Sequence, residues 1–200
     1  MDKSGTEKSI KIKKDTRKEL KMSIKKEKEH CTIDDIYALP EGKRAELING
    51  RIHSIESPST THQIVLGDLF YNIQMFILNN KESCQVIFAP FAVFLNQDTY
   101  VEPDLFVTCD MSKLDEKGCH GAPDWIIEIV SPNSEHMDYV IKQFKYRSTR
   151  VREYWIVDIK QKIVTVYNFE ESNICEYDFN RKIPVAIFNG ELQIDFSKFN

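Results

Sequence analysis

The sequence predicts an α/β or α+β domain built on a β-sheet. Strand-like segments, rich in β-branched and aromatic residues, outnumber helical ones along the chain. Two longer helical segments are set among these strands, which favours a sheet with helices packed on it. A chain of 200 residues, of which 42% are hydrophobic and 29% charged, is also the right size for one domain with a real core.

Two helices are indicated in the first half of the chain. Thr32 followed by Asp35 resembles a capping box, and Pro40 with Gly42 should end this first helix early. A longer helix is predicted for residues 62–78. Its apolar residues recur at helical spacing, so that one broad face packs inward: Val65, Leu66, Leu69, Phe70, Ile73, Phe76 and Ile77.

A third helix should follow Ser131 and Pro132. Asn133 or Ser134 can cap it, and it should run to about Thr149. Its predicted buried stripe consists of Met137, Ile141 and Phe144.

The strands are predicted from composition and turn signals. Residues 45–55 are typical of a hairpin, because Asn49-Gly50 is a strong signal for a two-residue turn. The other predicted strands are residues 84–95 with a break at Pro90, 99–108, 124–130, 153–159, 162–169, 174–179 and 190–196. Residues 109–123 between two of them are predicted to be a polar loop.

Charge divides the chain into a basic tail and an acidic body. Residues 1–30 hold eleven Lys and Arg against six Asp and Glu, a balance of +5, whereas the other 170 residues hold 16 against 25, a balance of −9. The tail has too few apolar residues to bury a core and is expected to be disordered. It is either a solvated extension or a basic arm that adds affinity for nucleic-acid phosphates. The folded domain should therefore span residues 31–200.

The cysteines and the hydropathy bear on location. Five cysteines with no CxxC pair predict reduced thiols, with neither a disulfide framework nor a zinc ribbon. The chain has no run of 18 apolar residues, and its N-terminus lacks the apolar stretch that secretion requires. We therefore expect a soluble, cytoplasmic protein with no membrane partner.

Acidic residues stand in two predicted strands where apolar ones are usual. Glu128 lies within DWIIEIV, and Asp104 follows Pro103 in VEPDLFV. A buried carboxylate costs several kcal/mol unless a cation compensates it. That cation can be a Lys or Arg in an ion pair, or a divalent metal, for which two carboxylates with carbonyls and waters suit Mg²⁺. The residues alone leave both open.

Four separated blocks resemble the bacterial Uma family of restriction endonucleases, within the PD-(D/E)XK nuclease superfamily. In order they are ALPEGKRAELINGRI, VEPDLFV, HGAPDWIIEIVSP and VREYWIVD, and the resemblance covers residues 32–199. It implies a restriction-endonuclease-like fold, a mixed β-sheet flanked by helices, for residues 31–200. It also implies a Mg²⁺-dependent endonuclease that hydrolyses phosphodiester bonds in DNA, with Mn²⁺ as a substitute metal. Double-strand cutters with one site per chain often pair by symmetry, which leaves a homodimer open.

The resemblance also implies site residues. Asp104 and Glu128 match the metal ligands of the superfamily, and the backbone carbonyl of Ile129 would complete the protein ligation. Glu46 matches an acid that assists a second metal or its waters; the alternative is a surface acid on an edge strand. The lysine usual two residues after the Glu is replaced by Val130, on the same face of the strand as Glu128.

A helical lysine offers a replacement. Lys142 matches the Lys of a D-x-x-x-K pattern in the relatives, four residues after Asp138 and four before Tyr146 on one helix face. Its ammonium would orient the attacking water; the alternative is an exposed lysine with an i,i+4 partner. His62 and Gln63 match a His-Gln pair of the family and are candidates for substrate binding; the alternative is a helix-capping or surface role. Glu102 has no such match and is expected to be either an edge acid or an acid just outside the metal ligands.

Two other classes of function remain open beside the enzyme. The missing lysine at position 130 motivates a catalytically inactive module that binds nucleic acid on the nuclease fold. Ion-paired acids would instead indicate a structural or partner-binding domain.

Overall fold

The structure, a computed structural model, describes residues 30–131 and 134–200. Its helices are α2 (Ile33–Tyr37), α3 (Thr60–Asn80) and α4 (Gln143–Ser148), with a π-helical segment η2 (Met137–Lys142) and short 3₁₀ turns η1 (Met111–Lys113), η3 (Ala186–Phe188) and η4 (Ser197–Phe199). The basic tail predicted for residues 1–30 lies outside the described residues except for His30, and so does the candidate cap Asn133.

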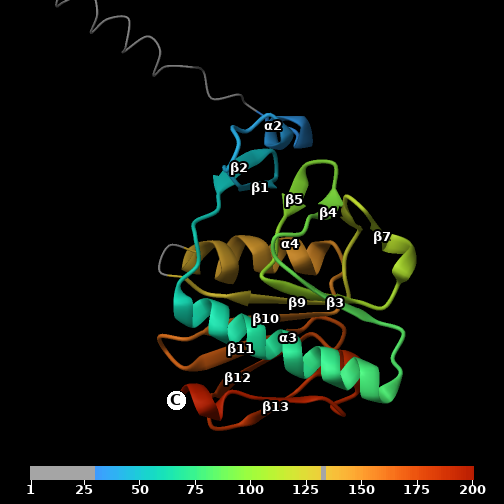
Figure 1. Ribbon diagram of the computed structural model, residues 1–200, viewed down its shortest axis with the longest axis vertical. Coiled ribbons are helices and arrows are strands. Elements are labelled where there is room, and N and C mark those ends of the chain that lie inside the picture. The colour runs from blue at the N-terminus through green and yellow to red at the C-terminus, as the bar shows by residue number, and fades with distance from the viewer. Residues whose placement is uncertain (1–29, 132–133) are drawn as a thin grey trace, which may run out of the picture.

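The strands form two six-stranded sheets and a small third one (Figure 1). The first sheet has the order β2-β1-β5-β4-β8-β7, the second β12-β11-β10-β9-β6-β3, and β13 pairs with β14. Their bounds are β1 (Ala45–Ile48), β2 (Arg51–Ser54), β3 (Gln85–Phe88), β4 (Val93–Asn96), β5 (Thr99–Val101), β6 (Leu105–Thr108), β7 (Leu114–Asp115), β8 (Gly118–His120), β9 (Trp125–Ile129), β10 (Glu153–Asp158), β11 (Ile163–Asn168), β12 (Asn173–Asp178), β13 (Lys182–Pro184) and β14 (Gln193–Asp195). Antiparallel and parallel pairs occur together, because β9 and β10 run parallel and the chain returns between them through η2 and α4. The predicted mixed sheet flanked by helices is confirmed.

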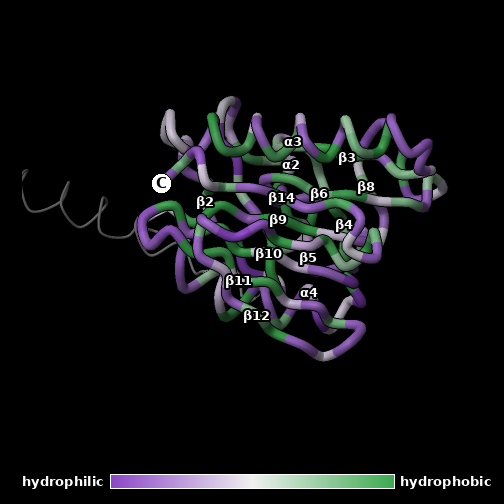
Figure 2. Tube along the Cα trace, turned by 90° about the horizontal axis from the view of Figure 1, so that it is seen from below, coloured by the Kyte–Doolittle hydropathy of each residue, from purple (hydrophilic) through white to green (hydrophobic). Residues whose placement is uncertain are grey.

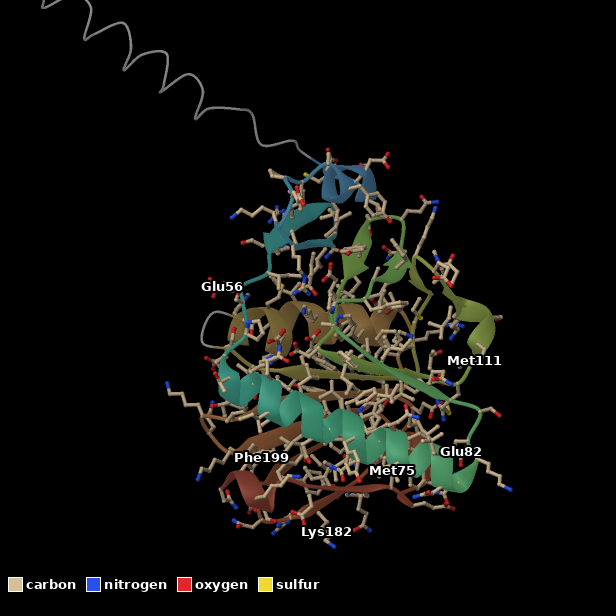
Figure 3. The ribbon with its side chains drawn as sticks, viewed as in Figure 1. Glu56, Met75, Glu82, Met111, Lys182 and Phe199 are labelled. Atoms are coloured by element: carbon tan, nitrogen blue, oxygen red, sulfur yellow. A yellow bond between two sulfur atoms is a disulfide. The ribbon has the colours of Figure 1, made fainter. Side chains whose placement is uncertain are left out.

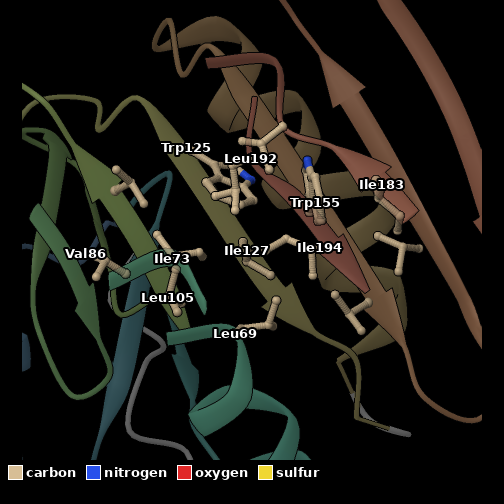
Figure 4. Close-up of a cluster of buried hydrophobic side chains, with 14 of the residues drawn as sticks. Leu69, Ile73, Val86, Leu105, Trp125, Ile127, Trp155, Ile183, Leu192 and Ile194 are labelled. Atoms are coloured by element: carbon tan, nitrogen blue, oxygen red, sulfur yellow. The ribbon is translucent and has the colours of Figure 1, made fainter. Parts of the chain in front are cut away.

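Helix α3 covers one face of the second sheet and shares the larger hydrophobic core with it. Ser59 caps the helix by accepting a hydrogen bond from the backbone of His62. Figure 4 shows Leu69 and Ile73 of α3 facing Leu105 and Ile127 of the sheet. The tube in Figure 2 shows hydrophobic residues along the central strands and hydrophilic ones at many of the outer turns.

Alternation along β9 decides which side of the sheet carries the site. Trp125, Ile127 and Ile129 belong to the cluster under α3, whereas Ile126 belongs to a second cluster with the first sheet and α4. Because side chains alternate between the faces of a strand, Glu128 shares the face of Ile126. The acid therefore points away from α3's core, toward η2, α4 and the first sheet.

The buried face of α3 should carry much of the stability. Leu69 is 1% exposed and Leu78 on the same helix is 61% exposed. We expect Leu69→Ala to lower the free energy of unfolding by about 2 to 5 kcal/mol, because it leaves a cavity in a packed core. The matched change Leu78→Ala should cost less than about 0.5 kcal/mol in urea unfolding. Equal losses from the two variants would contradict this packing.

Two predicted strands are each divided between the sheets. Residues 84–95 form β3 in the second sheet and β4 in the first, with Pro90 between them, and residues 99–108 form β5 and β6 on either side of Pro103. Proline cannot donate to a strand ladder, so each one marks the point where pairing with one sheet ends. The predicted loop 109–123 also contains the short strands β7 and β8.

The expectation of five reduced cysteines is wrong for two of them. Cys84 and Cys109 form a disulfide with sulfurs 1.99 Å apart. They flank the pair Gln85 and Thr108 in the β3–β6 ladder, so the antiparallel register brings them opposite each other. The spacing of the cysteines in the sequence does not predict this disulfide, because strand pairing in the sheet brings the two residues together.

The helix after the site buries charged residues as well as part of the predicted apolar stripe. Met137 and Ile141 are partly buried against the second core cluster, but Phe144 is 69% exposed. Fully buried in this segment are Asp138, Lys142, Lys145 and Tyr146. The π-helical turn of η2 shifts the helical register, and the helix faces the acids of β1 and β9 there. Burial in this segment follows the site's charges more than its hydrophobic residues.

Candidate active site

A cleft of about 930 Å³ opens between β1, the start of α3, the end of β9 and η2. The linker from β2 to α3 forms one wall, where Figure 3 labels Glu56. Among the lining residues are Glu46, Asp104, Glu128, Asp138 and Lys142. The structure thus gathers the four predicted catalytic side chains from four separate segments of the chain.

Three of the acids lie in, or directly beside, strands of the two large sheets. Glu46 lies in β1, Asp104 directly precedes β6, and Glu128 lies in β9. The backbone N–H of Ile129 donates to Asp104 Oδ2 at 2.7 Å, and that of Asp104 lies 3.4 Å from Glu128 Oε2. Glu46 Oε1 accepts the backbone N–H of Glu102 at 3.0 Å. Backbone donors therefore fix these carboxylates in place.

Lys142 lies between the acids. Its Nζ is 2.9 Å from Glu128 Oε1, 3.0 Å from Glu46 Oε1 and 3.7 Å from Asp138 Oδ1. Only 6% of the residue is exposed, so it is not the exposed lysine of the alternative interpretation. The helix supplies the cation that position 130 lacks, because the uncharged Val130 stands there, directly after β9.

Negative charge exceeds positive charge at the floor of the cleft. Burial raises the pKa of Glu128 to about 8, with Lys142 opposing the rise and Asp138, Asp104 and Glu46 adding to it. Burial likewise raises the pKa of Asp138 to about 6 against the opposing charge of Lys142. One lysine thus leaves these buried carboxylates incompletely neutralised.

A divalent cation fits this charge distribution. Among residues 30–131 and 134–200, no three His, Cys, Asp or Glu side chains are grouped so that they could hold a metal ion. The predicted ligand set has only two carboxylates, Asp104 and Glu128, with the carbonyl of Ile129. Mg²⁺ usually takes one or two protein carboxylates and keeps several waters, so that set suits it.

His62 lies against a predicted ligand. Its Nε2 is 3.1 Å from Asp104 Oδ2, while its Nδ1 is buried with no hydrogen-bond partner among the described residues. Burial lowers the pKa of His62, but the hydrogen bond and charge of Asp104, helped by the backbone of Ile129, raise it overall. Gln63 lines the cleft beside it. Both residues of the predicted pair therefore sit at the site, with His62 bound to an acid.

Glu102 lies beside the acids in an ion pair of its own. It accepts hydrogen bonds from Arg44 at 2.8 and 2.5 Å and from the Tyr100 hydroxyl at 2.6 Å. Its charge is therefore already compensated. Glu102 lines the cleft beside the site, but it is not at a sheet edge, because it directly follows β5, which lies between β1 and β4.

Two further residues of the site were noted in the sequence, but no role was predicted for them. Asp138 is 2% exposed and near Lys142, and the Tyr146 hydroxyl donates to Glu128 Oε1 at 2.8 Å. Burial, and then the charges of Glu128 and Glu46, raise the pKa of Tyr146 well above its ordinary value, so the phenol stays a donor. The signal was the i, i+4 spacing of Asp138, Lys142 and Tyr146 on one helix face.

The fold and the gathered acids define a restriction-endonuclease-like α/β protein. Residues 33–197 match the Uma2 family, described as "putative restriction endonuclease", and the chain belongs to that family. This confirms the resemblance seen in the four sequence blocks.

A solved structure supports the fold. It is a crystal structure described as a "putative nuclease belonging to DUF820" from Anabaena variabilis, with a TM-score of 0.70 and 22% sequence identity, and the match covers 84% of this chain and 96% of that one. A search of curated proteins finds no match. In the part of the chain that the structure describes, no helix has the length and apolar character needed to cross a membrane.

Proposed function

We propose that the protein is a divalent-metal-dependent endonuclease that hydrolyses phosphodiester bonds in DNA. The observation that carries the proposal is the excess of buried carboxylates around Lys142 at the floor of the cleft. Uncompensated buried charge costs stability, and active sites are where such groups are retained. Membership of a family described as restriction endonucleases supports the same reaction class.

The proposed metal ligands are Asp104, Glu128 and the carbonyl of Ile129, with Mg²⁺ as the cofactor and Mn²⁺ as a substitute. A bound divalent ion supplies a water of lowered pKa and charge stabilisation for the phosphate. Glu46, held by the backbone of Glu102, would assist by accepting hydrogen bonds from waters at the site.

Lys142 is proposed to position the attacking water. An ammonium has three donors. In the structure Nζ donates to Glu128 Oε1 at 2.9 Å and forms an ion pair with Glu46 at 3.0 Å. The third direction faces Asp138 at 3.7 Å, which is longer than a hydrogen bond. One donor therefore remains for a water or a phosphate oxygen in the cleft.

His62 and Gln63 are proposed to line the substrate path at the start of α3. His62 would also hold Asp104, because its Nε2 contacts that carboxylate. The first turn of α3 has no acidic residue to repel a phosphate, and a helix N-terminus favours negative charge.

Cleavage of supercoiled plasmid with Mg²⁺ or Mn²⁺, and with EDTA, tests the proposal. The wild type should cut only with metal, and Asp104→Asn should cut more than about a hundredfold more slowly, since even outer partners of metal ligands contribute 10- to 100-fold. Asp110→Asn is the matched control, because Asp110 is exposed at the start of η1 and does not line the cleft. Parallel single-strand and RNA substrates identify the nucleic acid.

Cutting that survives chelation, or an Asp104→Asn variant as active as the control, would overturn the mechanism. DNA binding without hydrolysis under every metal condition would support the inactive binding module instead. The observation that favours this second function is Val130, which stands where the superfamily usually has a lysine.

A further inference from the structure

The two oxygens of the Glu128 carboxylate have different surroundings. Oε1 accepts hydrogen bonds from Lys142 Nζ at 2.9 Å and from the Tyr146 hydroxyl at 2.8 Å. Oε2 faces the backbone N–H of Asp104 at 3.4 Å, the long end of hydrogen-bond distance. One oxygen is therefore engaged by two buried donors, and the other is directed at the neighbouring acid.

Tyr146 is itself held firmly. It is 0% exposed, and its ring packs edge-to-face on Tyr154 with centroids 4.9 Å apart. Its carbonyl accepts the backbone N–H of Val151 at 3.0 Å at the end of α4. Because ring and backbone are both fixed, the hydroxyl can point in few directions, and the one seen is toward Glu128.

A lysine alone does not determine the orientation of this carboxylate. The terminal torsion of a glutamate is broad and nearly two-fold, so either oxygen can turn toward a cation. Lys142 is a rotatable point charge surrounded by Glu46, Glu128 and Asp138, and it can follow such a rotation. The rigid phenol of Tyr146 cannot follow, so it selects one orientation.

We infer that Tyr146 is a positioning residue, which holds Oε1 of Glu128 together with Lys142 so that Oε2 alone is offered to the metal. This inference rests on the proposed function, because it specifies how one of the proposed ligands is aimed. Outer hydrogen bonds of this kind typically contribute 10- to 100-fold to metal affinity.

Tyr146→Phe and Tyr154→Phe form a matched pair for the test. Both tyrosines are 0% exposed and touch each other, but the Tyr154 hydroxyl donates to the backbone carbonyl of Asp138 at 3.1 Å and not to Glu128. Titration calorimetry with Mn²⁺ in the absence of nucleic acid should show a dissociation constant raised about 10- to 100-fold in Tyr146→Phe. Tyr154→Phe should bind Mn²⁺ like the wild type. The Mn²⁺ concentration giving half-maximal cleavage should shift in parallel, while the melting temperatures of the two variants fall by similar amounts.

A crystal of the wild type soaked in Mn²⁺ tests the same point without any variant. The ion should lie about 2.1 Å from Oε2, with Oε1 still on Tyr146. Ligation through Oε1 or through both oxygens would overturn the inference, as would equal loss of affinity in the two variants. If the wild type binds Mn²⁺ and cleaves, and Tyr146→Phe binds Mn²⁺ equally well, only the role of Tyr146 is overturned. If the wild type binds no Mn²⁺, the proposed function is overturned as well.

Discussion

Glu128→Gln should abolish cleavage while leaving the protein at least as stable as the wild type at pH 8. The amide oxygen can take over the hydrogen bonds that Oε1 accepts from Lys142 and Tyr146. The NH₂ group then stands where Oε2 was, and it cannot bind a metal. We expect cleavage to fall more than about a hundredfold, as for loss of a ligand itself.

The expected stability follows from the raised pKa of Glu128. Burial raises that pKa to about 8, so the ionised form is disfavoured in the fold. Removing one partner of a buried pair usually destabilises, but Lys142 keeps Glu46 at 3.0 Å and remains compensated. Replacing the excess carboxylate by a neutral isostere should therefore be neutral or stabilising, by up to about 2 kcal/mol at pH 8.

Glu153→Gln is the matched control for a buried acid. Glu153 is 0% exposed in the adjacent strand β10, where Oε1 accepts from Trp155 Nε1 at 2.7 Å and Oε2 from the backbone of Ile187 at 2.9 Å. The NH₂ group of the glutamine would face one of these two N–H donors. Urea unfolding should therefore show a free energy of unfolding lower by about 1 to 3 kcal/mol. Its cleavage rate should match the wild type. The reverse pattern, an active and destabilised Glu128→Gln, would make Glu128 a structural acid.

The sequence predicts the local elements well because their signals are local. Asn49 and Gly50 both adopt positive φ in the turn between β1 and β2, as a two-residue hairpin requires. The apolar spacing within residues 62–78 matches the buried face of α3. These features depend on residues that are close together in the sequence, so a single sequence is enough to predict them.

Partnerships between distant segments are not predicted in the same way. Pro90 predicts a break within residues 84–95 but not that β3 and β4 join different sheets. The disulfide of Cys84 with Cys109 follows from the pairing of β3 with β6, which the sequence does not predict either. Periodicity also fails for Phe144, because the rule assumes an apolar buried face, and here the buried face meets charged partners.

The acids of the site lie between these extremes. Glu128 within an apolar strand indicates a compensating cation from the residues alone, and Lys142 is within 2.9 Å of it. The resemblance was needed to select Lys142 among 27 Lys and Arg residues. The contact of His62 with Asp104 has no sequence signal, since it depends on where the start of α3 meets the start of β6.

Lys142→Met should destabilise the fold strongly, and the loss should depend on pH. The substitution keeps a flexible apolar side chain but leaves Glu46, Glu128 and Asp138 without their shared cation. Breaking a buried pair by removing one partner costs about 3 to 5 kcal/mol, and we expect a loss of this size at pH 8. Urea unfolding at several pH values measures it.

The pH dependence has a definite sign. A carboxyl whose pKa is higher in the folded protein than in the unfolded chain binds more protons when folded, so its contribution to stability falls as pH rises. Burial already raises the pKa of Glu128 to about 8 and that of Asp138 to about 6, and Lys142 opposes both shifts. Without Lys142 both rise further, so the deficit relative to the wild type should be small near pH 5 and grow toward pH 8.

Lys145→Met separates this effect from simple loss of a buried lysine. Lys145 in α4 is 8% exposed. Its Nζ lies 4.0 Å from Oδ1 of Asp98, whose side chain is 41% exposed. A contact of that kind contributes less than about 1 kcal/mol, so the control should lose little and show no such growth between pH 5 and pH 8. Mn²⁺ should raise the melting temperature of Lys142→Met more than that of the control if the metal takes over the lysine's charge. A deficit that grows on acidification would mean that the acids around Lys142 are not the source of its contribution, because protonating them removes the charge that the lysine compensates.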